Sequence, residues 1–278
     1  MSDSPSPCTR SVIITRLRAA GCVFAEDEAQ LLISTAQTPA ELAAMVDRRA
    51  AGLPLEHVLG WAQFCGLRIA VDPAVFVPRR RTEFLVHQAA ALARQAAGQG
   101  LTAPRTVVVD LCCGSGAVGA ALVAALDRVE LYAVDLDPTA VHCARRNLAA
   151  SGQVYEGDLY QPLPAALRGR VDILVANAPY VPTDAVGLMP PEARLHEPRV
   201  ALDGGADGLE VLRRVIAAAP RWLAPGGHLL VETSEHQAPQ TVKAIVRAGL
   251  IAQVSSYDEL DATVVIATRP TLHSGPGG

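Results

Sequence analysis

The chain has 278 residues, 50% of them hydrophobic but only 4% aromatic, and a formal net charge of −4. This length suits one large domain, or a catalytic domain with a smaller partner. A core of Ala, Val and Leu is typical of helices packed on a parallel sheet, so the composition favours an α/β fold. The acidic balance argues against a general nucleic-acid-binding protein.

The cysteines and the chain ends indicate a cytoplasmic protein. The six cysteines lack the spacing of metal ligands or of a disulfide framework, and the seven histidines are scattered, so we expect reduced thiols and no metal site. The first residues lack the apolar core of a signal peptide, and arginines interrupt the apolar run that follows. Residues 1–10 and 271–278 have the composition of disordered tails.

Residues 11–60 show the apolar spacing of short helices. The third of these helices has a defined start: Thr38 can cap it, Pro39 suits its first position, and Glu41 can complete a capping box. We therefore expect a small helical domain at this end of the chain.

A hairpin and a further helix follow this helical region. The sequence around Gly66 alternates as the two strands of a β-hairpin do, and a helical pattern then resumes before a break that contains Gly and Pro. We predict an N-terminal helical domain with its hairpin over residues 11–81, and a connector helix with a linker over residues 82–104.

Strand patterns alternate with helix patterns from residue 105 to residue 270. Strands are expected at residues 106–111, 130–134, 154–156, 171–176, 228–233, 252–257 and 263–268. Helices are expected at residues 117–126, 138–150, 208–223 and 239–248. Repeated βα units of this kind predict a doubly wound parallel sheet. The link between the last two strands is too short for a crossover helix, so these two strands should pair antiparallel.

The stretch "VVVDLCCGSGAVGAAL" is typical of a strand, a Gly-rich turn and a helix start, where an open α/β sheet binds a nucleotide-like ligand. Gly114, Gly116 and Gly119 have the spacing of a dinucleotide-binding turn, which is weak evidence on its own. Asp110 argues against a dinucleotide, because a pyrophosphate needs amide donors and no nearby carboxylate. The turn therefore favours a cationic cofactor.

Acidic residues stand at the ends of three successive strands: Asp110, Asp135 and Asp158. They suit the sulfonium and ammonium groups of S-adenosylmethionine. Asp135 can accept hydrogen bonds from both ribose hydroxyls, and Asp158 can reach the adenine amino group. Each acid alone could be a helix cap, but three in register favour the cofactor site. Cys112 replaces the usual leading glycine of the turn, which the turn tolerates if Cys112 keeps φ below zero.

The stretch "NAPY", Asn177 to Tyr180, follows a buried strand of the same sheet. A planar amide or aromatic amine is a poor nucleophile because its lone pair is delocalised. The Asn177 side-chain oxygen and the Ala178 carbonyl can bind its two N–H groups, orient the nitrogen and offset developing positive charge. Pro179 fixes the corner, and Tyr180 can stack on the flat target group. The motif suits glutamine amides and exocyclic base amines alike.

Taken together, the motifs resemble those of the protein-(glutamine-N5) methyltransferases of the HemK/PrmC class, which methylate the glutamine of the Gly-Gly-Gln motif in peptide chain release factors. The resemblance runs from about Ser11 to Arg269. It rests on "PLEHVLGWAQFCGLRIAVDPAVFVPR", "DLCCGSGA", "AVDLDP", "EGDLYQPL", "NAPYVP", "HEPRVALDGGADGLEVLRRVI" and "LAPGGHLLVE".

The resemblance implies a class I S-adenosylmethionine-dependent methyltransferase fold, with a seven-stranded, mostly parallel sheet, an antiparallel last strand and a helical N-terminal domain for substrate recognition. It implies S-adenosyl-L-methionine as cofactor and a release factor, or a protein with an analogous loop, as partner. The expected catalytic residues are Asn177, Ala178, Pro179 and Tyr180. The expected cofactor contacts are Asp110, Cys112, Cys113, Gly114, Ser115, Gly116, Asp135, Leu136, Asp158, Leu159 and Asn177.

The chain departs from the family pattern around the expected cleft. Ala178 stands where the family has a second proline, and Leu159 where an aromatic residue is common. Arg80 and Arg81 replace a neutral and an acidic residue, and the arginine that usually precedes the last strand is missing. We therefore expect a divergent paralogue whose substrate can differ, with Arg80 and Arg81 as exposed cations that choose the partner. The expected substrate contacts are Arg79, Arg80, Arg81, Glu197 and Pro198.

Two other functions compete with this interpretation. An adenine-amine methyltransferase acting on DNA or RNA could use the same motif, but the net charge and the lack of a basic recognition domain argue against it. A cofactor-binding module without catalysis is the other alternative. The changes at Cys112 and Ala178 favour it, whereas the retained Asn177 and Asp135 argue against it.

Overall fold

The computed structural model describes residues 7–96 and 105–271. Helix α1 (Pro7–Ala19) begins four residues before the predicted helical start, so residues 7–10 belong to a helix and not to a disordered tail. The remainder of the predicted N-terminal tail, residues 97–104 of the predicted linker, and residues 272–278 lie outside the described residues. No helix within the described ranges is long and apolar enough to cross a membrane.

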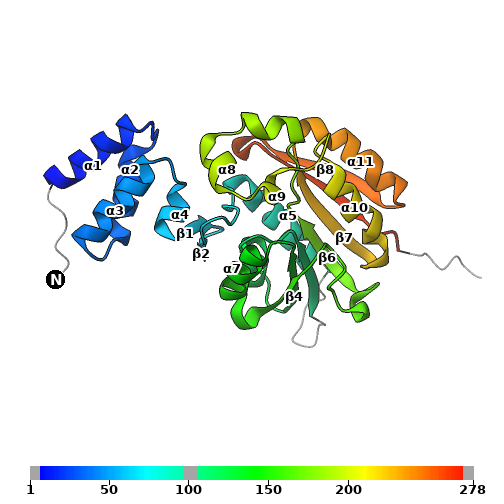
Figure 1. The fold of residues 1–278 in the computed structure, drawn as a ribbon. Helices are drawn as coiled ribbons and strands as arrows, with labels where there is room; N and C mark the ends of the chain where they lie inside the picture. Colours follow the sequence, from blue (N-terminus) through cyan, green and yellow to red (C-terminus); the bar gives the residue numbers. More distant parts are fainter. Residues whose placement is uncertain (1–6, 97–104, 272–278) are drawn as a thin grey trace, which may run out of the picture.

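The N-terminal helices α1, α2 (Ala25–Thr35), α3 (Pro39–Ala50) and α4 (Leu55–Leu59) form a separate lobe in Figure 1. They pack around a core of their own, formed by Ile13, Leu17, Cys22, Ala25, Ala29, Leu32, Met45, Val46 and Val58. The predicted start of α3 is confirmed: the Thr38 hydroxyl accepts a hydrogen bond from the Glu41 backbone N–H at 3.1 Å. The Glu41 carboxylate accepts from the N–H of Gln37, one residue before the partner that a capping box predicts.

One buried arginine joins this lobe to the rest of the molecule. Arg49 of α3 pairs with Glu28 of α2 at 2.5 Å and with Glu192 of helix α8 (Pro191–His196) at 2.6 Å. The Arg49 side chain is only 7% exposed and Glu28 is also buried, so burial strengthens this pair, whereas Glu192 is 47% exposed. A single guanidinium therefore connects two N-terminal helices with α8.

The predicted hairpin is present, and it packs on the α/β part of the chain. Strands β1 (Trp61–Phe64) and β2 (Leu67–Ala70) pair antiparallel, with Phe64 opposite Leu67. Ala62 of β1 and Cys143 of helix α7 (Pro138–Leu148) share a small buried cluster. Its other members, Val71, Val75 and Val77, follow β2 in the chain.

Helix α5 (Glu83–Ala96), predicted as a connector, covers one face of the main sheet. Its apolar residues recur at helical spacing, so burying that stripe requires a partner surface. Phe84 and Leu85 pack in the same cluster as Val108 and Ile173 of the sheet. The helix is therefore part of the α/β core and not only a linker.

The main sheet has seven strands in the order β5-β4-β3-β6-β7-β9-β8. All pairs are parallel except those that involve β9, which runs antiparallel to both β7 and β8. The predicted antiparallel last strand is thus confirmed. The strands are β3 (Thr106–Leu111), β4 (Val129–Asp135), β5 (Gly152–Glu156), β6 (Val171–Ala176), β7 (Leu223–Thr233), β8 (Ile251–Tyr257) and β9 (Ala262–Thr268). Only β7 differs from its predicted start by more than two residues.

Helices cover both faces of this sheet. Val107 and Val109 of β3 pack with α10 (Glu210–Ala218) and α11 (Ala238–Arg247), which lie beside β7 and β8 in Figure 1. Val108 points to the opposite face, toward α5 and α6 (Ala117–Ala125), as the two-residue period of a strand requires. The short helix α9 is Arg199–Leu202, and the 3₁₀ helices η1 to η7 are Arg80–Thr82, Ala149–Ser151, Ala165–Leu167, Thr183–Leu188, Ala219–Arg221, Glu235–Gln237 and Asp258–Leu260.

Candidate active site

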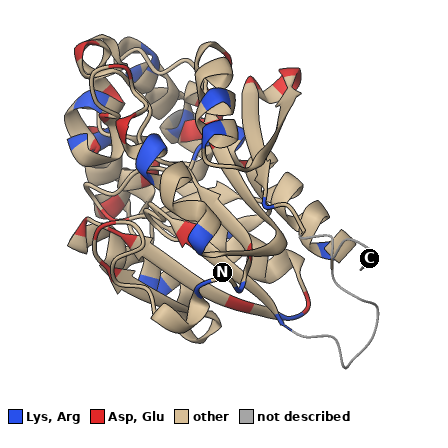
Figure 2. Ribbon diagram, turned by 90° about the vertical axis from the view of Figure 1, so that its right-hand side faces the viewer, with Lys and Arg blue, Asp and Glu red and all other residues tan. Residues whose placement is uncertain are grey.

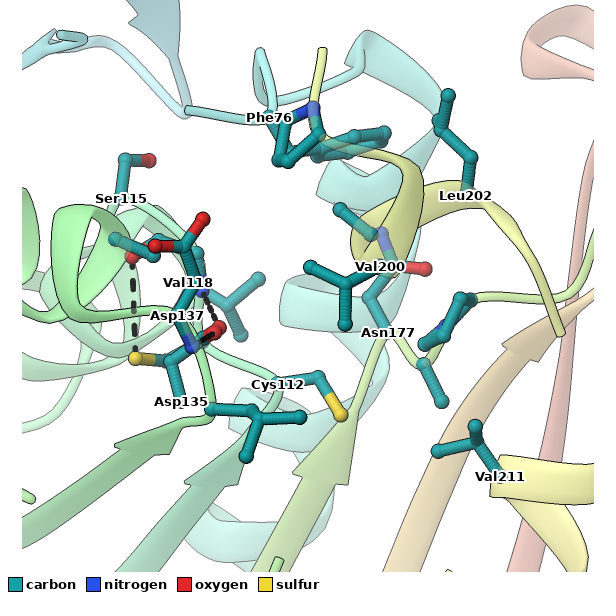
Figure 3. A pocket seen from close by; sticks show the side chains of 18 of the residues that line it. Phe76, Cys112, Ser115, Val118, Asp135, Asp137, Asn177, Val200, Leu202 and Val211 are labelled. Carbon is teal, nitrogen blue, oxygen red and sulfur yellow. Dashed lines mark hydrogen bonds between the residues drawn. The ribbon is translucent and has the colours of Figure 1, made fainter. Parts of the chain in front are cut away.

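A cavity opens at the carboxyl ends of β3, β4, β5 and β6. The strand order reverses between β3 and β6, the switch point at which open α/β sheets bind ligands. Figure 3 shows Asp135 and Asp137 on one side of this cavity and Asn177 with Val200 on the other. Nearly all of the predicted site residues line it. Those that do not are Gly116, Arg80 and Glu197.

The Gly-rich turn contains three residues in the left-handed region. Cys112 has a φ of 55°, Gly114 of 56° and Gly116 of 77°. The expectation that Cys112 keeps a negative φ is therefore wrong. The N–H of Cys113 still binds the carbonyl of Val134 of β4 at 3.0 Å, so the turn stays paired with the neighbouring strand while Cys112 takes a conformation that suits glycine. The cost at a residue with a Cβ is about 1 to 2 kcal/mol.

Gly116 and Gly119 serve packing. A Cβ on Gly116 would lie 3.2 Å from Ala144 of α7, so this glycine allows α6 and α7 to approach each other. A Cβ on Gly119 would lie 3.0 Å from Leu131 and 3.3 Å from the Asp110 carboxylate. Because Gly119, the third glycine of the motif, has no side chain, the Asp110 carboxylate can lie beside the start of α6.

Asp110 is buried, with 2% of its surface exposed, and its Oδ2 accepts a hydrogen bond from the Gly119 N–H at 3.0 Å. Burial raises the pKa of this carboxyl to about 7, although the Gly119 bond opposes the shift. Asp110 therefore joins the strand end to the first turn of α6, the capping role that the sequence offered as the alternative for each acid. It also lines the cavity.

Asp135 occupies the end of β4 and is held by backbone donors on both sides. Its Oδ2 accepts from the Gly114 N–H at 2.7 Å, and its Oδ1 accepts from the Asp137 N–H at 2.9 Å. A carboxylate has about four acceptor positions, so capacity remains for a ligand in the cavity. Burial raises the pKa of Asp135. The turn and the acid thus fix each other in place.

Asp158 has a partner that sequence reasoning missed. Its carboxylate forms an ion pair with Arg214 of α10 and also accepts from the Gln161 amide at 3.2 Å. An adenine amino group would share this carboxylate with Arg214. The neighbouring Leu159 is buried and has a φ of 51°, so the chain makes a second tight bend here.

The predicted clamp lies directly after β6. The Asn177 Nδ2 donates to the hydroxyl of Thr82 at 3.3 Å, which leaves its Oδ1 as an acceptor for another donor. Thr82 is 2% exposed and was not predicted as a site residue. The Ala178 carbonyl remains beside Asn177 although one proline of the family pattern is absent.

Two glycines allow a second backbone segment to approach the clamp closely. A Cβ on Gly204 would lie 2.5 Å from the Pro179 carbonyl oxygen, and one on Gly208 would lie 2.2 Å from the Tyr180 carbonyl oxygen. Gln237 donates to that same Tyr180 carbonyl at 2.9 Å. The segment "LDGGADG" therefore needs its glycines for close backbone approach, a signal that the sequence carried.

The three consecutive arginines have different surroundings. Arg79 pairs with Glu197, a buried carboxylate, at 2.6 Å, so these two predicted substrate residues bind each other. Arg81 pairs with the buried Glu232 at 3.2 Å and donates to the Tyr180 hydroxyl. Arg80 is exposed, and the Arg81 side chain is 40% exposed although it is paired. Of the two cations expected to be exposed and free for a partner, Arg81 is therefore only partly exposed and is already bound to Glu232.

Comparison with known proteins connects this cavity to a family. Residues 89–193 match the model of the methyltransferase small domain. The release factor glutamine methyltransferase of Geobacter sulfurreducens is 40% identical over 83% of this chain and 79% of its own length. The enzyme of the same name from Mycolicibacterium smegmatis is 37% identical over 87% of this chain and 85% of its own length. The chain belongs to the release factor glutamine methyltransferase family.

A solved structure agrees with this family at the level of the fold. The 16S rRNA methyltransferase of T. thermophilus, solved in complex with AdoMet and guanosine, has a TM-score of 0.51. It is 20% identical, and the match covers 75% of this chain and 49% of that chain. This likeness supports the class I methyltransferase fold of the release factor glutamine methyltransferase family.

The cavity fits a cationic nucleoside cofactor in its shape and charge. A Cβ built on Gly114 meets no atom within 4 Å, so the turn leaves open space at the cavity wall. Asp135 and Asp158 supply acceptors, and Leu136 and Leu159 supply apolar lining. The residues therefore suit the charge and the polar edges that a methyl-donating nucleoside presents.

Proposed function

We propose that this chain transfers a methyl group from S-adenosyl-L-methionine to the side-chain amide nitrogen of a glutamine, in the Gly-Gly-Gln motif of a peptide chain release factor. The observation that carries the proposal is the placement of Asn177 at the cavity, with its amide held by Thr82 at 3.3 Å and its oxygen left to accept. Membership of the release factor glutamine methyltransferase family supports the same substrate.

The cofactor would be held by the acidic side of the cavity. Asp135, fixed by the backbone of Gly114 and Asp137, would accept from the ribose hydroxyls, and Asp110 would favour the positive charge. The remainder of the cofactor would be contacted by Cys112 to Ser115 and by Leu136. When bound, this cofactor supplies a methyl group on a sulfonium, which is an electrophile that needs no metal.

The clamp would activate a weak nucleophile by orientation. The Asn177 oxygen and the Ala178 carbonyl would accept the two N–H groups of the glutamine amide and turn its nitrogen toward the methyl group. As the C–N bond forms, the bond between the methyl carbon and the sulfur would break and leave a neutral thioether, so positive charge passes to the nitrogen, where both oxygens would stabilise it. The methylated amide would then lose one proton to solvent. Because both acceptors are neutral oxygens, the clamp would act by orienting the amide nitrogen and by stabilising the positive charge that develops on it.

Tyr180 and a group of apolar residues would receive the substrate. Burial raises the pKa of the Tyr180 hydroxyl to about 12, so the phenol stays protonated at neutral pH. Its ring can stack on a planar amide. Phe76, Pro198 and Val200 form an apolar wall at the same cavity, which suits the entry of a loop from a protein.

The nucleic-acid alternative receives little support. Lys and Arg are interspersed with Asp and Glu along the ribbon in Figure 2, and the chain carries a formal net charge of −4. A polynucleotide substrate favours clustered Lys and Arg that bind its phosphates. The non-catalytic alternative is also weakened, because the turn forms with Cys112 in it and Ala178 keeps the carbonyl that the clamp requires.

The test is methyl transfer with a defined substrate. The purified chain is incubated with methyl-labelled S-adenosyl-L-methionine and a release factor, and the label is located by mass spectrometry. Label should appear on the glutamine of the Gly-Gly-Gln motif and be absent when that glutamine is replaced by alanine. Asn177→Ala should lower the single-turnover rate by about a hundredfold, as loss of one preorganised polar group does elsewhere. Label on DNA or RNA supplied in a parallel incubation would instead support the adenine-amine alternative.

A further inference from the structure

Arg81 lies between the clamp and the carboxyl end of β7, where Glu232 is placed. It is part of η1 (Arg80–Thr82), the short turn that precedes α5. Its Nη2 donates to the Tyr180 hydroxyl, and its Nε donates to Glu232 Oε1 at 3.2 Å. One rigid guanidinium therefore connects a residue of the proposed substrate site with a residue of the sheet.

Glu232 explains why Arg81 is fixed in this place. The Glu232 side chain is 2% exposed, and within the described part of the chain its Oε2 has no hydrogen-bond partner. A buried carboxylate needs a cation nearby, and Arg81 supplies it. Asp261, which precedes β9, adds a second negative charge that acts on Arg81. The guanidinium is thus held by negative charge on the side away from the cavity.

The contact with Tyr180 is made at one end of its ring. The Arg81 Cζ lies 5.7 Å from the ring centroid while the guanidinium binds the hydroxyl, so the contact is mainly at the oxygen. At the other end, Gln237 holds the backbone carbonyl of Tyr180 at 2.9 Å. The ring is therefore restrained both at its backbone and at its hydroxyl, beside the Asn177 amide.

We propose that Arg81 is a positioning residue: anchored by Glu232, it holds the hydroxyl end of Tyr180 in place, so that the side chain keeps one position beside the flat target amide. The proposal rests on the proposed function, because it requires Tyr180 to contact the substrate. Arg81 itself touches neither the transferred methyl group nor the nucleophile. It acts through the orientation of one aromatic ring.

The first experiment needs no substrate. The chain has five tyrosines, so tyrosine-selective ¹³C labelling with Tyr180→Phe as the assignment control gives the ring signals of Tyr180 by NMR. A ring held in one position shows a fixed set of nuclear Overhauser contacts to neighbouring protons, whereas a side chain that moves between rotamers loses them. We expect these contacts in the wild type and their loss in Arg81→Met/Glu232→Gln. Unchanged ring contacts in this double variant would overturn the proposal.

The double variant also separates positioning from simple charge neutralisation. Arg81→Met alone leaves Glu232 buried and unpaired, so it should lower the melting temperature. Adding Glu232→Gln should restore most of that stability. The single-turnover methyl-transfer rate should nevertheless stay about tenfold to a hundredfold below the wild type, since misplacement of a positioning group costs this much. Recovery of the rate together with the stability would show that Arg81 only neutralises Glu232.

A mutant cycle tests the route through the hydroxyl. If Arg81 acts through Tyr180, then Arg81→Met/Glu232→Gln in a Tyr180→Phe background should change the rate by less than about twofold, because the contact is already absent. If the double variant lowered the rate in the Tyr180→Phe background as much as it does with Tyr180 present, this route would be contradicted. Arg146→Met, which removes an ion pair with Asp72 outside the cavity, serves as the control for loss of an arginine. A wild type that methylates no release factor would count against the proposed function alone, because the ring signals do not depend on a substrate.

Discussion

The side-chain amide of Asn177 donates a hydrogen bond to the hydroxyl of Thr82, with 3.3 Å between nitrogen and oxygen. The two residues are separated by 95 positions in the chain. Thr82 is buried at the end of η1, immediately before α5, so this short 3₁₀ turn fixes the rotation of the clamp amide. The hydrogen bond decides which end of the amide faces the cavity.

Thr82→Val should therefore impair catalysis more than cofactor binding. Valine keeps the shape of threonine but offers no acceptor, so the Asn177 amide can turn its N–H groups toward the substrate. We expect the single-turnover rate to fall about tenfold, the effect of losing a hydrogen bond of about 1 to 1.5 kcal/mol. Thr82→Ser, which keeps the hydroxyl, should retain most of the rate. Equal rates for the serine and valine variants would contradict the role of the hydroxyl.

Asp135→Ala should weaken binding of S-adenosyl-L-methionine by about 1.5 to 3 kcal/mol, the range for hydrogen bonds to a charged group. The same change also frees the N–H groups of Gly114 and Asp137, so circular dichroism must first show a folded variant. Isothermal titration calorimetry measures the affinity. Unchanged affinity in a folded variant, or tighter binding of NAD than of S-adenosyl-L-methionine by the wild type, would refute the assignment of the cofactor.

The stability of variants at Cys112 should depend on how well the new residue tolerates a φ of 55°. Cys112→Gly removes the strain of a Cβ in this region, and we expect a gain of about 0.5 kcal/mol after the higher entropy of an unfolded glycine is subtracted. Cys112→Val, with its β-branch, should lose about 2 kcal/mol or more. Urea unfolding measures both. A valine variant as stable as the glycine variant would mean that the turn relaxes to another conformation.

The Asp110 carboxyl should make stability depend on pH in a defined window. Burial raises its pKa from 3.8 to about 7 in the folded protein. The folded state therefore keeps a proton that the unfolded state loses, and its stability advantage falls as pH rises from about 4 to about 7. In Asp110→Asn this contribution is absent. Urea unfolding at several pH values should therefore show that the wild type loses stability relative to Asp110→Asn as pH rises from about 4 to about 7.

The sequence predicted those parts of the structure that local patterns specify. The strand from Thr106 to Leu111 and the strand from Val171 to Ala176 have the predicted ends, because apolar runs bounded by turn residues leave little choice. The Gly-rich turn and the "NAPY" segment line one cavity, because the carboxyl ends of parallel strands share an edge of the sheet.

The contacts between distant segments were not predictable in this way. Arg81 and Glu232 are 151 positions apart, and nothing near Arg81 indicates that it faces a buried carboxylate. The same holds for Arg214 on Asp158, 56 positions away. Side-chain pairing of this kind depends on the packing of whole segments. The sign of φ at Cys112 was missed because it follows from the path of the turn and not from the residue type.

The Arg49 contacts determine how salt acts on this molecule. Arg49 bridges Glu28 in the N-terminal lobe and Glu192 in α8, and its side chain is only 7% exposed. Counterions screen exposed charges at physiological ionic strength but reach a buried guanidinium poorly. Glu192 is 47% exposed, so added salt should weaken its pair with Arg49 more than the buried pair of Arg49 with Glu28. Kinetics measured across ionic strengths would then report both the approach of a charged partner and a looser contact between the N-terminal lobe and α8.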